Sequence, residues 1–144
     1  IWLRGKLPQS DVLPYLAAQI AGAVVSAFLV THFRGAGSET PLTQPLRAAG
    51  AEFLGPFALA WVVLNVATAK GTAGNSFYGA AIGMVVASGI FLFGGISGAV
   101  FNPAVAVAGG ILNLLPLPTI ALYTVVSIAA ALAAAKLFLR IEKR

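Results

Sequence analysis

The feature that most constrains this chain is a long stretch without any ionisable side chain. From Gly71 to Ala135 the sequence contains no Asp, Glu, Lys, Arg or His. Only 9% of all residues are charged and 59% are hydrophobic, whereas roughly a quarter of the residues in an ordinary soluble domain are charged. The stretch can hold two membrane spans of about 20 residues and a connector. The chain is therefore predicted to be embedded in lipid.

Four apolar segments are long enough to cross a bilayer as helices. Connectors rich in polar and turn-forming residues, at about 34–47 and 70–76, separate the first three of them. We expect one domain over residues 1–144, an all-α membrane protein with four transmembrane helices and one re-entrant half-helix. The predicted spans are about 12–33, 48–69, 77–93 and 119–139.

The distribution of Lys and Arg predicts the orientation. Four spans place the N-terminal segment, the 70–76 link and the C-terminal tail on one side of the membrane. Cytoplasmic loops carry an excess of basic residues, so both termini are predicted to be cytoplasmic. That side holds Arg4, Lys6, Lys70, Lys136, Arg140, Lys143 and Arg144, and the other side holds Arg34 and Arg47.

Several function classes find no support in the sequence. The basic residues lie at the ends of apolar runs and form no stripe with interleaved aromatics, which argues against nucleic acid as a partner. The chain has no Cys and one His, and it lacks paired carboxylates and Gly-rich phosphate loops. We therefore expect no enzyme activity, no cofactor and no metal site.

The segment from Gly94 to Pro118 suits neither a continuous span nor a water-facing loop. It has too many glycines and prolines for the first and too few polar groups for the second. Irregular backbone at membrane depth is tolerated where it is buried in protein or lines a water-filled cavity. Pro103 is suited to the first position of a helix, and Gly109-Gly110 or the residues just beyond would end it. The sequence predicts a re-entrant loop and half-helix at about 94–112.

Such a half-helix would create a polar track at the centre of the membrane. It would aim unsatisfied N–H groups and the positive end of its dipole at the bilayer midplane. Asn102, just ahead of it, can offer amide donors to a passing oxygen. The carbonyls of Gly98, Ala99 and Val100 can offer acceptors along the same path.

The residues around Asn102 resemble a known family. SGAVFNPAV resembles the Asn-Pro-Ala signature of the aquaporin, or major intrinsic protein, family, here Asn102, Pro103 and Ala104. The stretch 81–91 resembles the family's fifth span. Glu52 resembles the buried acid at the start of the fourth span, and the sequence around Gln19 resembles the third span. The resemblance runs in family order to the C-terminus. The first two spans and the first Asn-Pro-Ala loop have no counterpart, so we expect a truncated or processed product.

The resemblance implies roles for further residues. Glu52 would brace the 94–101 loop by accepting hydrogen bonds, with Gln19 as a second supporting residue or a helix-to-helix contact. The family's narrow filter maps onto Ile90, Ala99 and Val105. Water channels of the family have His and Arg at the positions of Ile90 and Val105, and glycerol channels have Asp at that of Ala106. These departures imply a pore without strict selectivity for water. The resemblance as a whole implies a passive channel for water or small neutral solutes in a lipid bilayer, assembled as a homotetramer.

Two other functions stay open. Half of a secondary transporter would share the broken helix at the midplane, but it needs ion-coupling residues and only Glu52 is available. Alternatively, the chain is a non-conducting fragment or assembly partner. A pore lined by the dipoles of two opposed half-helices requires both, and this sequence encodes only one. The sequence also predicts that the first span packs against protein along Ala18, Gly22 and Ser26, where small side chains allow close approach.

Overall fold

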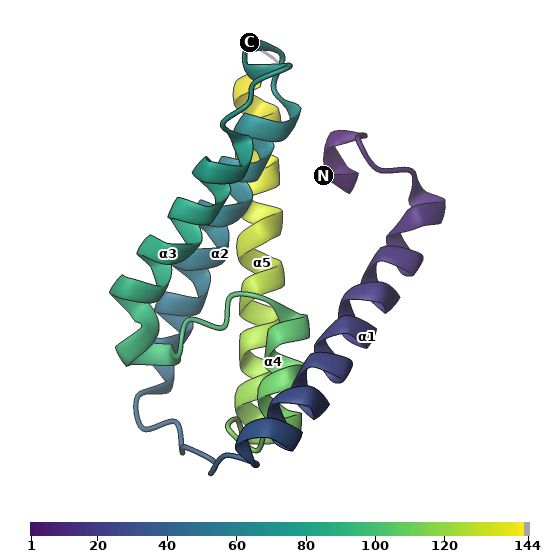
Figure 1. The fold of residues 1–144 in the computed structure, drawn as a ribbon. Coiled ribbons are helices and arrows are strands. Elements are labelled where there is room, and N and C mark those ends of the chain that lie inside the picture. The colour runs from purple at the N-terminus through teal and green to yellow at the C-terminus, as the bar shows by residue number, and fades with distance from the viewer. Residues whose placement is uncertain (143–144) are drawn as a thin grey trace.

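The computed structural model describes residues 1–142, and every regular element within them is helical. Figure 1 shows four long helices and one short one, α4, that reaches only part of their length. Lys143 and Arg144, which entered the charge count, lie outside the described residues. The helices are α1 (Gln9–Arg34), α2 (Pro45–Thr68), α3 (Tyr78–Ser97), α4 (Pro103–Ile111) and α5 (Leu117–Glu142), with 3-10 turns η1 (Trp2–Arg4) and η2 (Lys70–Thr72).

The four long helices confirm the prediction of an all-α protein with four apolar segments. Each is long and apolar enough to cross a membrane. They also expose large apolar side chains, among them Phe91 at 89% and Phe33 at 79%. Contiguous apolar surface of this kind marks contact with lipid or with another protein, because water would disfavour it.

Helix α3 extends beyond the predicted third span. We expected the helix to stop at Phe93 and the re-entrant loop to begin at Gly94. Instead α3 continues through Gly94 and Gly95 to Ser97, and Gly98 ends it in the left-handed conformation at φ 82°. Glycine lowers helix propensity by only about 1 kcal/mol, which tertiary packing overrides. The irregular segment is therefore shorter than predicted, spanning residues 98–102.

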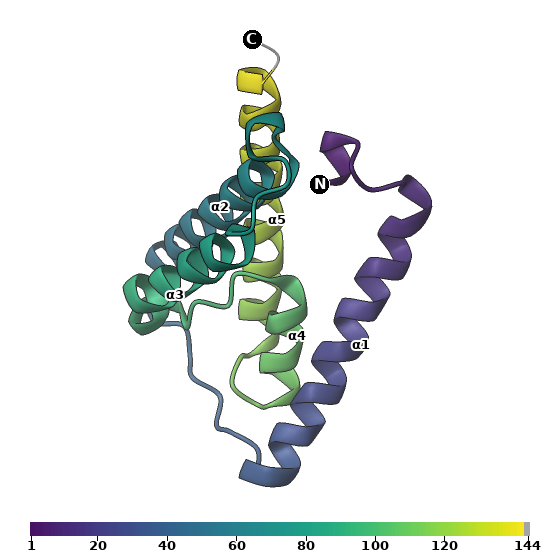
Figure 2. The ribbon, with the colours of Figure 1, turned by 45° about the horizontal axis from the view of Figure 1, so that its top comes forward.

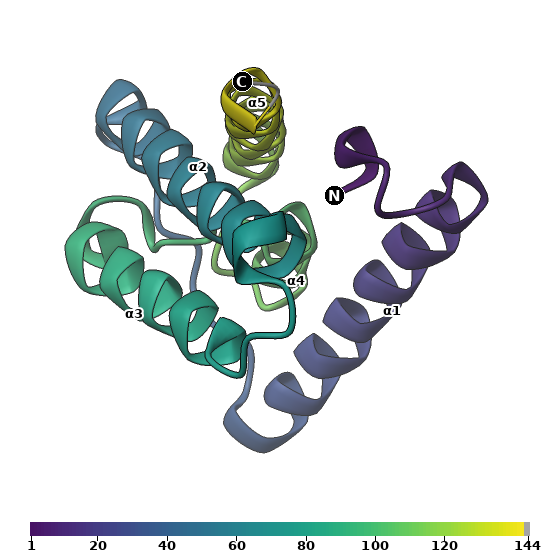
Figure 3. The same cartoon turned by 90° about the horizontal axis from the view of Figure 1, so that it is seen from above.

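Helix α2 is the centre of the bundle and packs against both α3 and α5. Helix α4 packs against α5 on one side and α1 on the other. In the turned views of Figures 2 and 3, α1 stands away from the α2–α3 pair, with α4 between them. Helix α1 therefore joins the bundle mainly through the short helix.

The small-residue stripe on α1 does not make the contact that the sequence predicted. Ala18, Gly22 and Ser26 are exposed, and a Cβ added at Gly22 would meet nothing within 4 Å. The buried residue of α1 is Ala27, on another face. Within residues 1–142 the stripe has no partner, because α1 turns the face around Ala27 toward α4.

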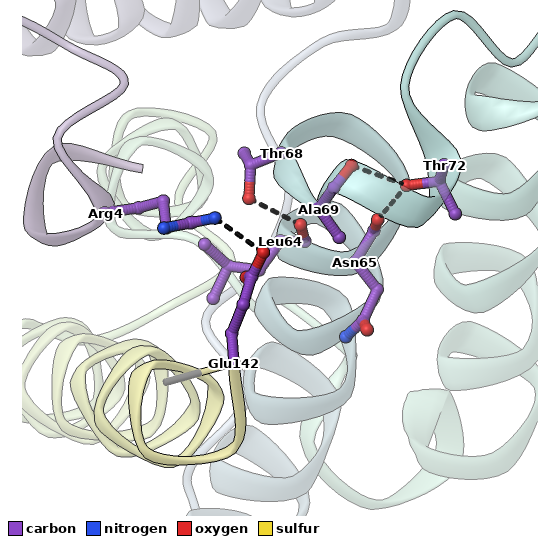
Figure 4. A network of polar contacts seen from close by, with 7 residues as sticks. All are labelled: Arg4, Leu64, Asn65, Thr68, Ala69, Thr72 and Glu142. Atoms are coloured by element: carbon purple, nitrogen blue, oxygen red, sulfur yellow. Dashed lines mark hydrogen bonds and ion pairs between the residues drawn. The ribbon is translucent and has the colours of Figure 1, made fainter. Parts of the chain in front are cut away.

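The two ends of the molecule are held by different contacts. The upper part of Figure 1 contains η1, η2 and the end of α5. There Arg4 forms an ion pair with Glu142 at 2.7 Å, drawn in Figure 4, and its guanidinium lies 5.4 Å from the centroid of the Phe138 ring. The same view shows the Thr72 hydroxyl donating to the Asn65 carbonyl at 2.5 Å. These bonds tie η1 to α5, and η2 to the end of α2.

At the opposite end the connector between α1 and α2 is bonded to the turn that follows α4. The N–H of Gly37 donates to the Leu112 carbonyl at 2.8 Å, and the N–H of Thr40 donates to the Leu114 carbonyl at 3.2 Å. The Asn113 amide returns a bond to the Gly37 carbonyl at 3.1 Å. The C-terminal end of α4 is thereby fixed at this end of the bundle.

Candidate functional site: a half-helix and its strained entry loop

Helix α4 begins part-way along the bundle and ends at the face where its segment entered. In Figure 1 the chain leaves the lower end of α3, rises to about mid-height, and returns downward as α4. The nine residues Pro103–Ile111 are about 14 Å long at 1.5 Å per residue, roughly half of a 30 Å hydrocarbon core. Pro103 occupies the first turn, and the Asn102 side chain caps the helix by accepting from the N–H of Ala104 at 2.9 Å. The re-entrant arrangement agrees with the predicted fold.

The loop before α4 has a strained backbone. Ala99 and Phe101 have φ angles of 51° and 56°, in the left-handed region that side chains with a Cβ disfavour. Each such residue costs roughly 1–2 kcal/mol. Surrounding contacts must therefore hold the loop in place.

Glu52 supplies most of those contacts. Its side chain is completely buried, at 0% exposure, on the first half of α2. One carboxylate oxygen accepts from the Val100 N–H at 2.8 Å and from the Ser97 hydroxyl at 2.7 Å, and the other accepts from the Phe101 N–H at 2.7 Å. Three donors surrounding a buried carboxylate compensate for its lost hydration. The acid therefore fixes the loop to α2.

Ser97 and Tyr123 extend this network to α5. The Ser97 hydroxyl, besides donating to Glu52, accepts from the Ala99 N–H at 3.1 Å. The Tyr123 hydroxyl donates to the Ser97 carbonyl at 3.0 Å, at the end of α3. Three helices, α2, α3 and α5, thus converge on the start of the loop through buried polar groups.

Phe101 anchors the other end of the loop by packing. Its ring lies between Gly55 of α2 and Gly89 of α3, and it meets Phe93 edge-to-face at 6.2 Å between centroids. A Cβ at Gly89 would lie 2.6 Å from the ring, and one at Gly55 would overlap it. Only glycine leaves room for the ring at these two positions. The position of the Phe101 ring is therefore fixed by both α2 and α3.

The hydrogen bonds of the loop leave its acceptors free. The N–H groups of Ala99, Val100 and Phe101 all donate to Ser97 or Glu52. Within residues 1–142 the carbonyls of Gly98, Ala99 and Val100 accept no hydrogen bond, and the Asn102 side-chain nitrogen donates none. The loop consequently presents three acceptors beside one amide donor.

Two separate cavities are lined by neighbouring residues of the loop and the start of α4. The larger, of about 620 Å³, is bounded by the α1–α2 connector, the loop and α4, and it includes Gly98, Val100 and Val105 in its lining. The smaller, of about 350 Å³, extends from Asn102 and Pro103 toward Ile1 and Ala135. The junction between the loop and α4 thus separates a cavity on the connector side from one on the side of the termini.

Comparison with protein families matches residues 39–144 to the family described as Major intrinsic protein. The chain belongs to the major intrinsic protein family. This family includes aquaporins, which are membrane channels and not enzymes. The predicted resemblance is confirmed.

Curated relatives agree with this assignment. Aquaporin AqpM from Methanothermobacter marburgensis is 33% identical over 114 residues, covering 72% of this chain and 46% of its own length. Putative aquaporin NIP4-1 from Arabidopsis thaliana is 36% identical over 105 residues, covering 69% of this chain and 36% of its own length. The chain thus spans about half or less of the relatives that it matches. No solved structure matches it significantly.

The structure brings only part of the predicted filter of this aquaporin-family chain together. Val105 lines the larger cavity beside Gly98 and Val100. Ile90 is exposed on α3, and within residues 1–142 neither it nor Ala99 lines either of the two cavities described above. The joint role of Ile90, Ala99 and Val105 stays a prediction. Gln19 is exposed on α1 and has no hydrogen bond to the loop in the described chain, so its supporting role also stays a prediction.

Sequence reasoning did not single out Phe101, Ser97 or Tyr123. The loop itself carries little signal for them, because an apolar ring and two hydroxyls are ordinary in membrane helices. The available signal was the pair of glycines on different helices, Gly55 and Gly89, whose common partner only the fold identifies.

Proposed function

We propose that this chain contributes to a passive membrane channel for water and small neutral solutes. The observation that carries the proposal is the set of free acceptors on Gly98, Ala99 and Val100 beside the free amide donor of Asn102. They lie at a junction with a cavity on either side. A solute that both donates and accepts hydrogen bonds could exchange its hydration for these groups, as in other selective pores. Membership of a channel family supports the same reading.

The chemistry of the junction favours neutral solutes. The N-terminus of α4 directs the positive end of its dipole toward the junction, which disfavours cations. Ile90 and Val105 are apolar where water channels of the family have His and Arg. We infer a wider and less polar constriction, which would admit small neutral solutes besides water.

The test separates transport from folding by one isosteric substitution. Asn102→Asp keeps an oxygen that can cap α4, removes the amide donor and adds a negative charge, and Asn102→Ser, a neutral capping residue, controls for that charge. Loss of one hydrogen bond of about 1 kcal/mol lowers a rate roughly fivefold. In reconstituted vesicles, stopped-flow light scattering should therefore show wild-type water permeability well above that of protein-free vesicles and a several-fold fall in the variant. The melting temperature should change little. Glycerol and urea gradients then define the solute range.

A correctly inserted wild-type chain with lipid-like permeability would contradict the proposal for the chain alone and favour assembly with a second partner. The exposed apolar surface of α1 and α3 suits such a partner as well as lipid. We also propose a homotetramer as the assembled state, and light scattering of the detergent complex would give its mass.

We further propose that both termini face the cytoplasm. Arg4, Lys6, Lys70, Lys136 and Arg140 occur in or beside the segments at the end where the termini lie, and Arg34 and Arg47 flank the opposite connector. The chain has no Cys, so single cysteines can report their side. In intact cells a membrane-impermeant thiol reagent should label Ser38→Cys and spare Asn75→Cys. The reverse pattern would refute this orientation.

A further inference from the structure

The larger cavity contains one charged side chain. Among its lining residues only Arg47 carries a formal charge. The carboxylate of Glu52, which is bonded to the lining residues Ser97 and Val100, is itself fully buried and accepts three hydrogen bonds. The remaining polar lining comes mainly from hydroxyl and amide groups, including Thr40, Thr43 and Gln44. We propose that Arg47 sets the electrostatic potential of this cavity and selects against cations before they reach the junction at Asn102. This inference deepens the proposed function and rests on it.

Arg47 is exposed and lies in the first turn of α2. Its guanidinium donates to the Gln44 side-chain oxygen at 3.2 Å. Gln44 lines the same cavity and is the residue that precedes α2. The backbone of this first turn therefore places the charge at the wall that the connector and the start of α2 form.

The dimensions of the cavity allow one charge to act across it. A volume of 620 Å³ corresponds to a width of about 10 Å, close to the Debye length of roughly 8 Å at physiological ionic strength and well below that of about 30 Å at 10 mM salt. Apolar walls strengthen the interaction further, because they exclude water from part of the path. Val105, at the other wall, contributes no charge of its own. Arg47 consequently acts on ions in the same cavity that Val105 lines.

A cysteine introduced at Val105 measures this potential without requiring conduction. The natural chain has no Cys, and the Val105 side chain is 48% exposed while lining the cavity. Val105→Cys should react faster with a sulfonate-bearing methanethiosulfonate than with its trimethylammonium counterpart. Adding Arg47→Gln at 10 mM salt should change each rate about threefold in opposite directions, so the ratio of the two rates falls about tenfold. The change should shrink at 150 mM salt.

Arg34→Gln is the matched control. Arg34 ends α1 at the same end of the molecule, is exposed, and does not line the cavity. Because it lies outside the cavity lining, it should lower the ratio of rates by much less than Arg47→Gln does. Glu39→Gln, which removes the acid next to Thr40 in sequence, should raise the ratio by a similarly small amount. An unchanged ratio in Arg47→Gln, or an equal change in Arg34→Gln, would overturn the inference. Thiol labelling does not depend on transport. A chain that shows no permeability in the vesicle assay therefore still gives a decisive ratio of the two labelling rates.

Discussion

Replacing Glu52 with alanine should abolish transport and destabilise the protein by several kcal/mol. The substitution leaves the Ser97 hydroxyl and the N–H groups of Val100 and Phe101 without their buried acceptor. Each unsatisfied buried donor costs roughly 1–3 kcal/mol. The loop would also lose the contacts that hold Ala99 and Phe101 at positive φ. Thermal unfolding in detergent, followed by the vesicle assay, measures both effects.

Glu52→Gln refines the same test. Glutamine has nearly the same volume, but its amide nitrogen would face one of the donors that the carboxylate accepts. Glu52→Gln should lower the melting temperature measurably, but by less than Glu52→Ala does. Glu39→Gln, an exposed acid in the α1–α2 connector, should change the melting temperature little. If Glu52→Ala melted like the wild type, the buried carboxylate would not be what holds the loop.

Alanine at Gly55 or Gly89 should be nearly as damaging, although it adds only one methyl group. At both positions the new Cβ would collide with the Phe101 ring, which lies in a loop with little freedom to move. Overpacking of this kind costs typically 1–3 kcal/mol. Moving the ring would also displace Asn102, the next residue, so transport should fall together with the melting temperature.

Each glycine has a control on its own helix. A Cβ added at Gly50 of α2 or Gly83 of α3 would meet nothing within 4 Å in the described chain. Alanine at either position should be neutral or should stabilise by up to about 1 kcal/mol, because alanine favours helix over glycine. Equal losses at all four positions would show that the Phe101 ring is not the cause. The double variant Gly89→Ala with Phe101→Ala should recover part of the stability lost by Gly89→Ala.

Much of the local structure was predictable from residue type and spacing. Uninterrupted apolar runs have few stable arrangements other than spanning helices, so the four long helices follow from composition and length. Pro103 suits the first turn of a helix, and Asn102 suits the cap, so the start of α4 was also predictable. The end of α3 was not, because Gly94 and Gly95 remain helical where neighbouring helices support them.

Some residues of the candidate site were also predictable from the sequence, and others were not. Asn102 and Glu52 were identifiable because a polar side chain within apolar sequence needs a reason. The family resemblance also implied that Glu52 accepts hydrogen bonds from the 94–101 loop. Which donors it accepts from, the Ser97 hydroxyl and the N–H groups of Val100 and Phe101, only the fold decided. The packing of the Phe101 ring between Gly55 and Gly89 could not be predicted either, because the sequence does not show which surfaces of α2 and α3 are in contact.

By itself the sequence determined which segments can lie in a bilayer and where a helix must begin within it, because lipid allows few ways to satisfy the backbone. Only the tertiary structure decided how the entry loop is held, since that depends on contacts between helices distant along the chain. Its donors turn inward to Glu52 and Ser97, and its acceptors are left free beside Asn102. The placement of Arg47 at the larger cavity was decided there too, because only the fold brings the start of α2 to the same cavity as the loop and α4.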